Sequence, residues 1–190
     1  MRTRESTYSF PRMNSDERLG EMVLYISIAC VQDPTYGATK LNKILQKADL
    51  LCFASYGTPL TGAEYQALPA GPAPIRLLPV RNRLLAAGDI REEMVPMGTR
   101  TQIRTIALRA ANTSLFAPQV LETTDAVIRE LWGKSATDAS AESHGRAWRI
   151  ARKAGSSIPY EAAFLGDDDV ASADDRKRAE ELARQSGWNR

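Results

Sequence analysis

The only histidine of the chain, His144, is the first place to look for acid–base or nucleophilic chemistry. No acidic residue stands near it in a spacing known from catalytic triads, and the two cysteines, Cys30 and Cys52, lie inside apolar helical patterns. A cysteine in such a pattern usually packs as a small buried thiol. The sequence therefore predicts no catalytic residue. His144 is expected either to form a hydrogen bond between helices or to lie in a binding surface.

Metal and nucleotide sites lack their sequence signatures. The run Asp167-Asp168-Asp169 has carboxylates that suit a cation, but no glutamate follows at the spacing of a calcium loop, so a polar turn before a helix is favoured. The glycine-rich phosphate loops and the HExxH zinc motif are absent. We therefore expect neither a metal nor a cofactor.

Composition indicates a folded protein with no overall preference for nucleic acid. Of the 190 residues, 43% are hydrophobic and 25% are charged, and the net charge is only +2. One segment is locally basic, because residues 76–109 contain seven arginines and three acidic residues. This segment fits either a winged-helix element that contacts phosphates or a solvated helix face.

The most apolar run, residues 22–31, is about half the length that a membrane span requires. The first twenty residues mix acidic and basic side chains and contain no apolar stretch of a secretion signal. We therefore expect a cytoplasmic protein without a membrane partner.

Apolar residues at helical spacing predict most of the secondary structure. A first helix is expected to begin near Ser15 and to stop before Asp33, and a second to begin near Thr39 and to end at Gly57. On the second helix Lys40, Lys43, Lys47 and Asp49 are expected on the outer sides. Further helices are expected at residues 74–87, 118–131, 137–151 and 173–185.

Proline, glycine and β-branched residues predict the remaining segments. Residues 57–74 are expected to be an ordered loop stiffened by prolines, with Tyr65 buried against the second helix and its hydroxyl paired. In the following helix, Pro79 allows either a kink or a start nearer Leu78. Residues 89–95 and 101–108 are expected to form a β-hairpin.

Together these patterns predict a mainly α-helical fold: a single helical domain with a small β-hairpin and a charged C-terminal helix. Residues 1–14 are expected to be a flexible leader, residues 15–166 the helical domain, and residues 167–190 a charged helical appendage.

Several motifs along the chain resemble those of one known family. They are Thr39-Lys40-Leu41-Asn42-Lys43-Ile44-Leu45 with Ala48-Asp49, Tyr56-Gly57-x-Pro59-Leu60-Thr61-Gly62-Ala63-x-Tyr65, Leu68-Pro69-x-Gly71-Pro72-x-Pro74, Leu84-x-x-x-Gly88, Ser114-Leu115-Phe116, Leu131-Trp132-Gly133, Ser143-His144, Trp148 and Ile158-Pro159-Tyr160. In order and spacing the chain resembles the Panacea domain, the SocA-like antitoxin domain of bacterial and phage proteins, over residues 22–165.

The resemblance implies an antitoxin of a toxin–antitoxin pair, which neutralises a cognate protein toxin by binding it. Some relatives look instead like adaptors that deliver a toxin to a protease, and self-association of the chain stays open. The partner-binding candidates are Lys43, Asp49, Tyr65, His144 and Trp148. Aromatic residues such as Tyr65, Trp132 and Trp148 fit either partner anchors or the core. A winged-helix DNA-binding regulator is the alternative from another class.

Overall fold

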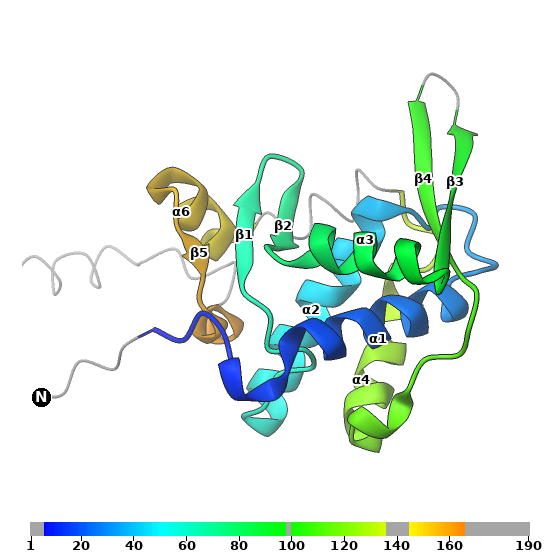
Figure 1. Ribbon diagram of the computed structural model, residues 1–190. Coiled ribbons are helices and arrows are strands. Elements are labelled where there is room, and N and C mark those ends of the chain that lie inside the picture. The colour runs from blue at the N-terminus through cyan, green and yellow to red at the C-terminus, as the bar shows by residue number, and fades with distance from the viewer. Residues whose placement is uncertain (1–5, 98–99, 136–144, 166–190) are drawn as a thin grey trace, which may run out of the picture.

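The computed structural model of the protein describes residues 6–97, 100–135 and 145–165. Helices dominate this part of the chain, and two small antiparallel sheets accompany them (Figure 1). The α-helices are α1 (Ser15–Ala29), α2 (Ala38–Tyr56), α3 (Leu77–Ala87), α4 (Pro118–Leu131) and α6 (Arg146–Ala154). The strands are β1 (Tyr65–Leu68), β2 (Gly71–Pro74), β3 (Ile90–Met97), β4 (Arg100–Ala107) and β5 (Ser157–Ile158). Short 3-10 helices are η1 (Pro11–Met13), η2 (Thr113–Leu115) and η3 (Tyr160–Phe164).

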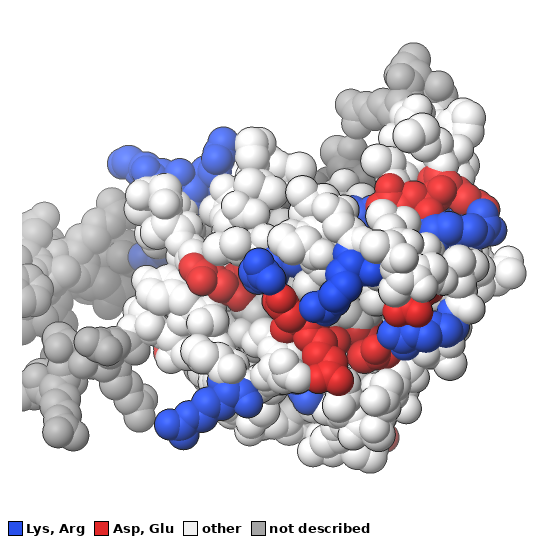
Figure 2. All heavy atoms as spheres, in the orientation of Figure 1, with Lys and Arg blue, Asp and Glu red and all other residues white. Residues whose placement is uncertain are grey.

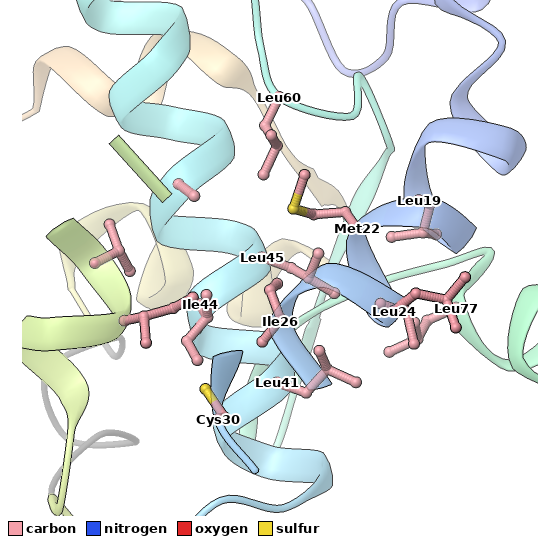
Figure 3. Close-up of a cluster of buried hydrophobic side chains, with 14 of the residues drawn as sticks. Leu19, Met22, Leu24, Ile26, Cys30, Leu41, Ile44, Leu45, Leu60 and Leu77 are labelled. Atoms are coloured by element: carbon pink, nitrogen blue, oxygen red, sulfur yellow. The ribbon is translucent and has the colours of Figure 1, made fainter. Parts of the chain in front are cut away.

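Helices α1 and α2 form the centre of the main core. The apolar stripe predicted on each helix is buried, as in Leu19 and Ile26 of α1 and Ile44 and Leu45 of α2. Figure 3 shows these side chains in one cluster with Leu60 and Leu77, which come from the segments that follow α2. Burial of such aliphatic side chains contributes about 1.5 to 3 kcal/mol each. The two predicted helices are therefore confirmed, and they pack through the predicted faces.

Helices α3 and α4 complete this core. Helix α4 has the bounds predicted from its apolar spacing, and it buries Val127, Ile128 and Leu131. Helix α3 begins at Leu77, so Pro79 stands in its first turn, where a missing amide donor costs little. The start near Leu78 is thus observed rather than a kinked helix from residue 74. Gly88 ends α3 with a φ of 73°, in the left-handed region that glycine favours.

The predicted β-hairpin is present as β3 and β4, whose register runs from Ile90 opposite Ala107 to Met97 opposite Arg100. A second sheet was not predicted. In the segment expected to be an ordered loop, β1 and β2 form a hairpin with Tyr65 opposite Pro74, and β5 joins the other side of β1. Prolines are tolerated in β2 because it is an edge strand. The fold is therefore helix-dominated, with two sheets rather than one hairpin.

Residues 7–10 lie against the body, although the sequence places them in a flexible leader. The carbonyl of Thr7 accepts a hydrogen bond from the Tyr160 amide at 2.8 Å, and the Phe10 amide donates to the Gly62 carbonyl at 3.0 Å. The Phe10 ring also packs edge-on against Tyr160, with centroids 5.0 Å apart. Backbone pairing with two distant segments fixes this stretch, a relationship that composition does not reveal.

The remaining sequence predictions concern segments that are not described. Residues 1–5, most of the predicted helix at 137–151 and the charged segment 167–190 lie outside the described residues. Within the described ranges, no helix has the length and apolar character needed to cross a membrane.

Candidate functional site

Three charged residues of α2 are buried, in contrast to the prediction that they lie on its outer sides. Lys40, Lys43 and Asp49 are 1%, 2% and 0% exposed. Helix α2 lies between α1 and α4 on its apolar side and the β1–β2 hairpin and η3 on its polar side. Because segments cover both sides, polar positions of α2 face protein rather than water. Only Lys47 of this set is substantially exposed, and it pairs with Glu130 of α4.

Asp49 is the hydrogen-bond acceptor that holds the start of the β1–β2 hairpin. Its Oδ1 accepts from the amides of Thr61 and Gly62 at 2.7 and 3.3 Å. Its Oδ2 accepts from the Tyr65 hydroxyl at 2.7 Å and from the Thr61 hydroxyl. Tyr65 is 2% exposed, so the predicted burial of this ring and the predicted pairing of its hydroxyl are confirmed.

The burial of this cluster alters its acid–base properties. Desolvation raises the pKa of Asp49 above its ordinary value, and the hydrogen bonds from Thr61, Tyr65 and Gly62 offset part of that effect. Desolvation, together with the neighbouring Asp49, also raises the pKa of the Tyr65 phenol well above its ordinary value. The phenol thus stays protonated and remains a donor to the carboxylate.

Lys43 holds the turn of the same hairpin. Its Nζ donates to the carbonyl of Ala70 at 2.8 Å, and Ala70 lies in the two-residue connection between β1 and β2. Burial of the ammonium group lowers the pKa of Lys43 to about 8. The turn is therefore fastened to α2 by a buried lysine.

Trp148 of α6 holds the end of β1. Its indole Nε1 donates to the carbonyl of Leu68 at 3.0 Å, and the neighbouring Arg152 reaches the carbonyl of Ala67 at 3.4 Å. The structure thus brings Lys43, Asp49, Tyr65 and Trp148 together around one element, the β1–β2 hairpin. The fifth candidate, His144, lies outside the described residues.

Comparison with known proteins gives one positive result. The sequence profile of the family described as antitoxin SocA-like, Panacea domain, matches residues 41–149, more than half of the chain. The chain belongs to this family. No curated protein and no solved structure matches it. The matched range begins in α2 and ends in α6, so it contains all five candidate residues of the Panacea domain.

An aromatic cluster around Tyr160, a residue outside the matched range, also supports the Panacea hairpin. Tyr160 is 1% exposed, donates its hydroxyl to the Ala63 carbonyl at 2.7 Å, and packs against the rings of Phe10, Phe53 and Tyr65. A shallow depression next to it is lined by Gln46, Leu50, Tyr65, Ile158 and Tyr160. Sequence reasoning noted the Ile158-Pro159-Tyr160 motif but did not single out Tyr160. The sequence feature that could have pointed to Tyr160 is its position as an aromatic residue directly after a β-branched residue and a proline.

A buried ion pair fixes the turn before α2 of the Panacea domain. Lys40 Nζ lies 2.7 Å from Asp33 Oδ2, and both side chains are 1% exposed. The Thr35 amide and hydroxyl also donate to Asp33 Oδ1, at 2.9 and 2.8 Å. Burial opposes ionisation of Asp33, but these hydrogen bonds outweigh it and hold its pKa below the ordinary value. Sequence reasoning used Asp33 only as a helix stop and missed this pair.

The remaining candidate chemistry of the Panacea domain is sparse. Among the described residues no group of three His, Cys, Asp or Glu side chains is placed to hold a metal ion. Cys30 and Cys52 are buried free thiols, as predicted. Burial raises the pKa of each thiol to about 12.

Most arginines of the basic segment 76–109 are bound within the protein. Arg76, Arg81, Arg91 and Arg109 form ion pairs with Asp16, Glu92, Glu93 and Glu21 respectively, and Arg109 also contacts Asp89. A phosphate would have to compete with these carboxylates. The winged-helix interpretation therefore loses part, but not all, of the free positive charge on which it rested, because Arg83 and Arg104 donate to backbone carbonyls rather than to carboxylates.

Proposed function

We propose that this chain is an antitoxin that neutralises a cognate protein toxin by direct binding, without catalytic activity of its own. The observation that carries the proposal is the match to the SocA-like antitoxin family over residues 41–149. The buried polar groups of that range argue against a catalytic role for them. Asp49, Tyr65 and Lys43 are engaged in internal hydrogen bonds, which leaves them unavailable to a substrate.

The fastened hairpin suits a preformed binding surface. The turn is held by Lys43, the start of β1 by Asp49 and its end by Trp148. A surface that is rigid before binding loses less conformational entropy when a partner docks. We infer that α2, the aromatic cluster and α6 act as a frame that presents this part of the molecule to the toxin.

The test is co-expression with the small protein encoded beside this chain. If the proposal holds, that protein alone arrests growth, co-expression restores growth, and the two proteins purify as one complex. An empty vector and an unrelated antitoxin serve as controls. Growth arrest that persists beside this chain, or a neighbour without toxicity, contradicts the proposal.

The same strains separate blocking from delivery to a protease. Blocking predicts that the amount of toxin on an immunoblot stays constant or rises when this chain is present, because the bound toxin is sheltered. Delivery predicts that the toxin disappears, and that it returns when the host's ATP-dependent proteases are deleted. Loss of the toxin would replace direct neutralisation by the adaptor mechanism.

A further inference from the structure

The outward side of α6 has an unusual composition for a surface helix. Its inward side carries Ala151, which is 3% exposed, and Trp148, which is bound to the hairpin. The other side carries three exposed residues, Arg149, Ile150 and Lys153. Lys153 follows Arg149 by four positions and Ile150 by three, so the three side chains are neighbours on the helix surface. Ile150 keeps 56% of its surface open to solvent. We call these three residues the outer face of α6.

The positive charges of Arg149 and Lys153 are not neutralised by a carboxylate within the described part of the chain. Residues 146–154 contain four cations and no carboxylate. In that part of the chain neither Arg149 nor Lys153 has a carboxylate partner, whereas ion pairs with carboxylates are formed by Arg76, Arg81, Arg91 and Arg109. Figure 2 shows the Lys and Arg atoms gathered over α6 at the upper left of the molecule.

Helix stability alone does not account for this arrangement. Arg152 and Lys153 occupy the last turn, where the helix dipole favours cations. Arg149, however, lies in the middle of the helix, three residues from Arg152 and four from Lys153. Like charges at these spacings destabilise a helix slightly. The helix thus carries a repulsion that an anionic partner would relieve.

The outer face is held on a rigid base. The Trp148 and Arg152 side chains donate to the carbonyls of Leu68 and Ala67, which fastens α6 to β1. Leu68 itself is 39% exposed. The charged face therefore stands on the same hairpin that α2 and the aromatic cluster fix in place.

We propose that the outer face of α6 is the surface on which the toxin docks, and that the toxin presents an acidic patch around a small apolar depression. This inference rests on the proposed antitoxin function. An exposed aliphatic side chain with cations on either side resembles a protein interface, in which an apolar centre is surrounded by a polar rim. Binding to phosphate groups would use the cations but would give Ile150 no partner. A protein partner uses all three residues.

The experiment compares variants in their affinity for a non-toxic variant of the neighbouring protein, by calorimetry. Arg149→Glu/Lys153→Glu is expected to raise Kd by at least about tenfold, because like charges then face each other. Ile150→Ala is expected to raise Kd by about tenfold without changing its salt dependence. The matched control is Arg12→Glu/Arg129→Glu, which makes the same change in net charge at two other exposed positions. Unchanged melting temperatures show that each variant is folded.

A charge-swap experiment sharpens the test. Exposed acidic residues of the toxin are replaced by lysine, one surface patch at a time. We expect the lysines of a single patch to restore binding to Arg149→Glu/Lys153→Glu. Raising the salt concentration is expected to weaken the wild-type complex, and to weaken the Arg149→Gln/Lys153→Gln complex less steeply.

The possible failures are distinguishable. If the wild type binds the toxin and the α6 variants bind equally well, the docking surface is wrong and the antitoxin function stands. If the control variant weakens binding as much, the effect is one of net charge and the inference fails. If the wild type does not bind the neighbouring protein, both proposals fail. The wild type and the α6 variants are also tested at low salt with a mixed-sequence DNA duplex and with anionic lipid vesicles. If only the wild type binds one of these, and the variants still bind the toxin normally, the face belongs to another partner and the inference fails.

Discussion

The Tyr65 hydroxyl donates a hydrogen bond to Asp49 Oδ2 at 2.7 Å in a site where the two residues are 2% and 0% exposed. Tyr65 begins β1, and Asp49 lies in α2, sixteen residues earlier. Because water cannot replace either partner, the bond joins the hairpin to the helix for as long as the domain is folded. Both residues were candidates for partner contact, and their burial makes their influence on a partner an indirect one.

The first prediction concerns this bond. Tyr65→Phe is expected to lower the free energy of unfolding by about 1 to 3 kcal/mol, because Asp49 loses a donor in a dry site. Tyr65→Ala is expected to cost about 3 to 5 kcal/mol, since a buried ring is also lost. Urea unfolding measures both values. Tyr56→Phe is the control, because Tyr56 is 45% exposed, and it should change stability by less than about 0.5 kcal/mol. A similarly small effect of Tyr65→Phe would contradict the role assigned to the bond.

The second prediction concerns Lys43 and pH. Burial lowers its pKa to about 8, whereas the pKa of a lysine in an unfolded chain is about 10.4. Between these values the native state binds fewer protons than the unfolded state, so the contribution of Lys43 to the free energy of unfolding rises with pH. Below pH 8 both states are charged and that contribution is constant.

Urea unfolding at a series of pH values tests this behaviour. The difference in stability between the wild type and Lys43→Met should be flat between pH 6 and 7.5 and should then shift in favour of the wild type up to about pH 10. Lys47→Met, which removes a partly exposed lysine from the same helix, is measured in parallel as the matched control. A difference for Lys43→Met that is constant or decreasing over the upper range is incompatible with a buried ammonium group.

Apolar periodicity was sufficient to predict the helices of the core. The stripes of α1 and α2 and the bounds of α4 could be predicted because each helix buries one continuous apolar face. Periodicity gave no information about the polar side of α2. Whether Asp49 meets water or protein depends on a hairpin that begins sixteen residues later and on η3 at Tyr160, more than a hundred residues away. The local sequence around Asp49 does not indicate that such distant segments will cover it.

The second sheet escaped prediction for a related reason. Strand β2 reads Gly-Pro-Ala-Pro, a composition that argues against a strand unless it lies at an edge. Strand β5 has only two residues, and its partner Tyr65 lies ninety-three positions earlier than Ile158. Of the candidate site residues, Lys43, Asp49, Tyr65 and Trp148 meet at the β1–β2 hairpin, which their motifs did not indicate. The hydrogen bonds that join Lys43 and Trp148 to the hairpin required the structure.

The third prediction concerns the cysteines. Burial raises the pKa of Cys30 and Cys52 to about 12, so almost no thiolate is present at pH 8, and both side chains are closed to reagents. Ellman's reagent is expected to release no colour from the native protein at pH 8 and to detect both thiols in concentrated guanidinium. The denatured sample is the internal control. Rapid reaction of one thiol in the native protein would show that its helix opens readily.

The fourth prediction concerns the buried pair of Lys40 and Asp33, whose charged atoms lie 2.7 Å apart. Lys40→Met leaves a buried carboxylate without its cation and is expected to cost about 3 to 5 kcal/mol. Asp33→Asn keeps an acceptor for Thr35 but leaves the ammonium group of Lys40 without a counterion, and it is expected to cost a similar amount.

The double variant distinguishes a coupled pair from two independent contributions. Lys40→Met/Asp33→Asn removes both charges together, so its cost should fall short of the sum of the single costs by at least about 1 kcal/mol, within the range measured for residues in contact. Thermal and urea unfolding supply the four free energies of the cycle. Arg76→Met is the exposed counterpart, because it breaks the surface pair with Asp16 and should lower stability far less than loss of the buried pair. Strictly additive costs at Lys40 and Asp33 would show that the two charges act separately, and that the turn before α2 is fixed by the hydrogen bonds of Thr35 alone.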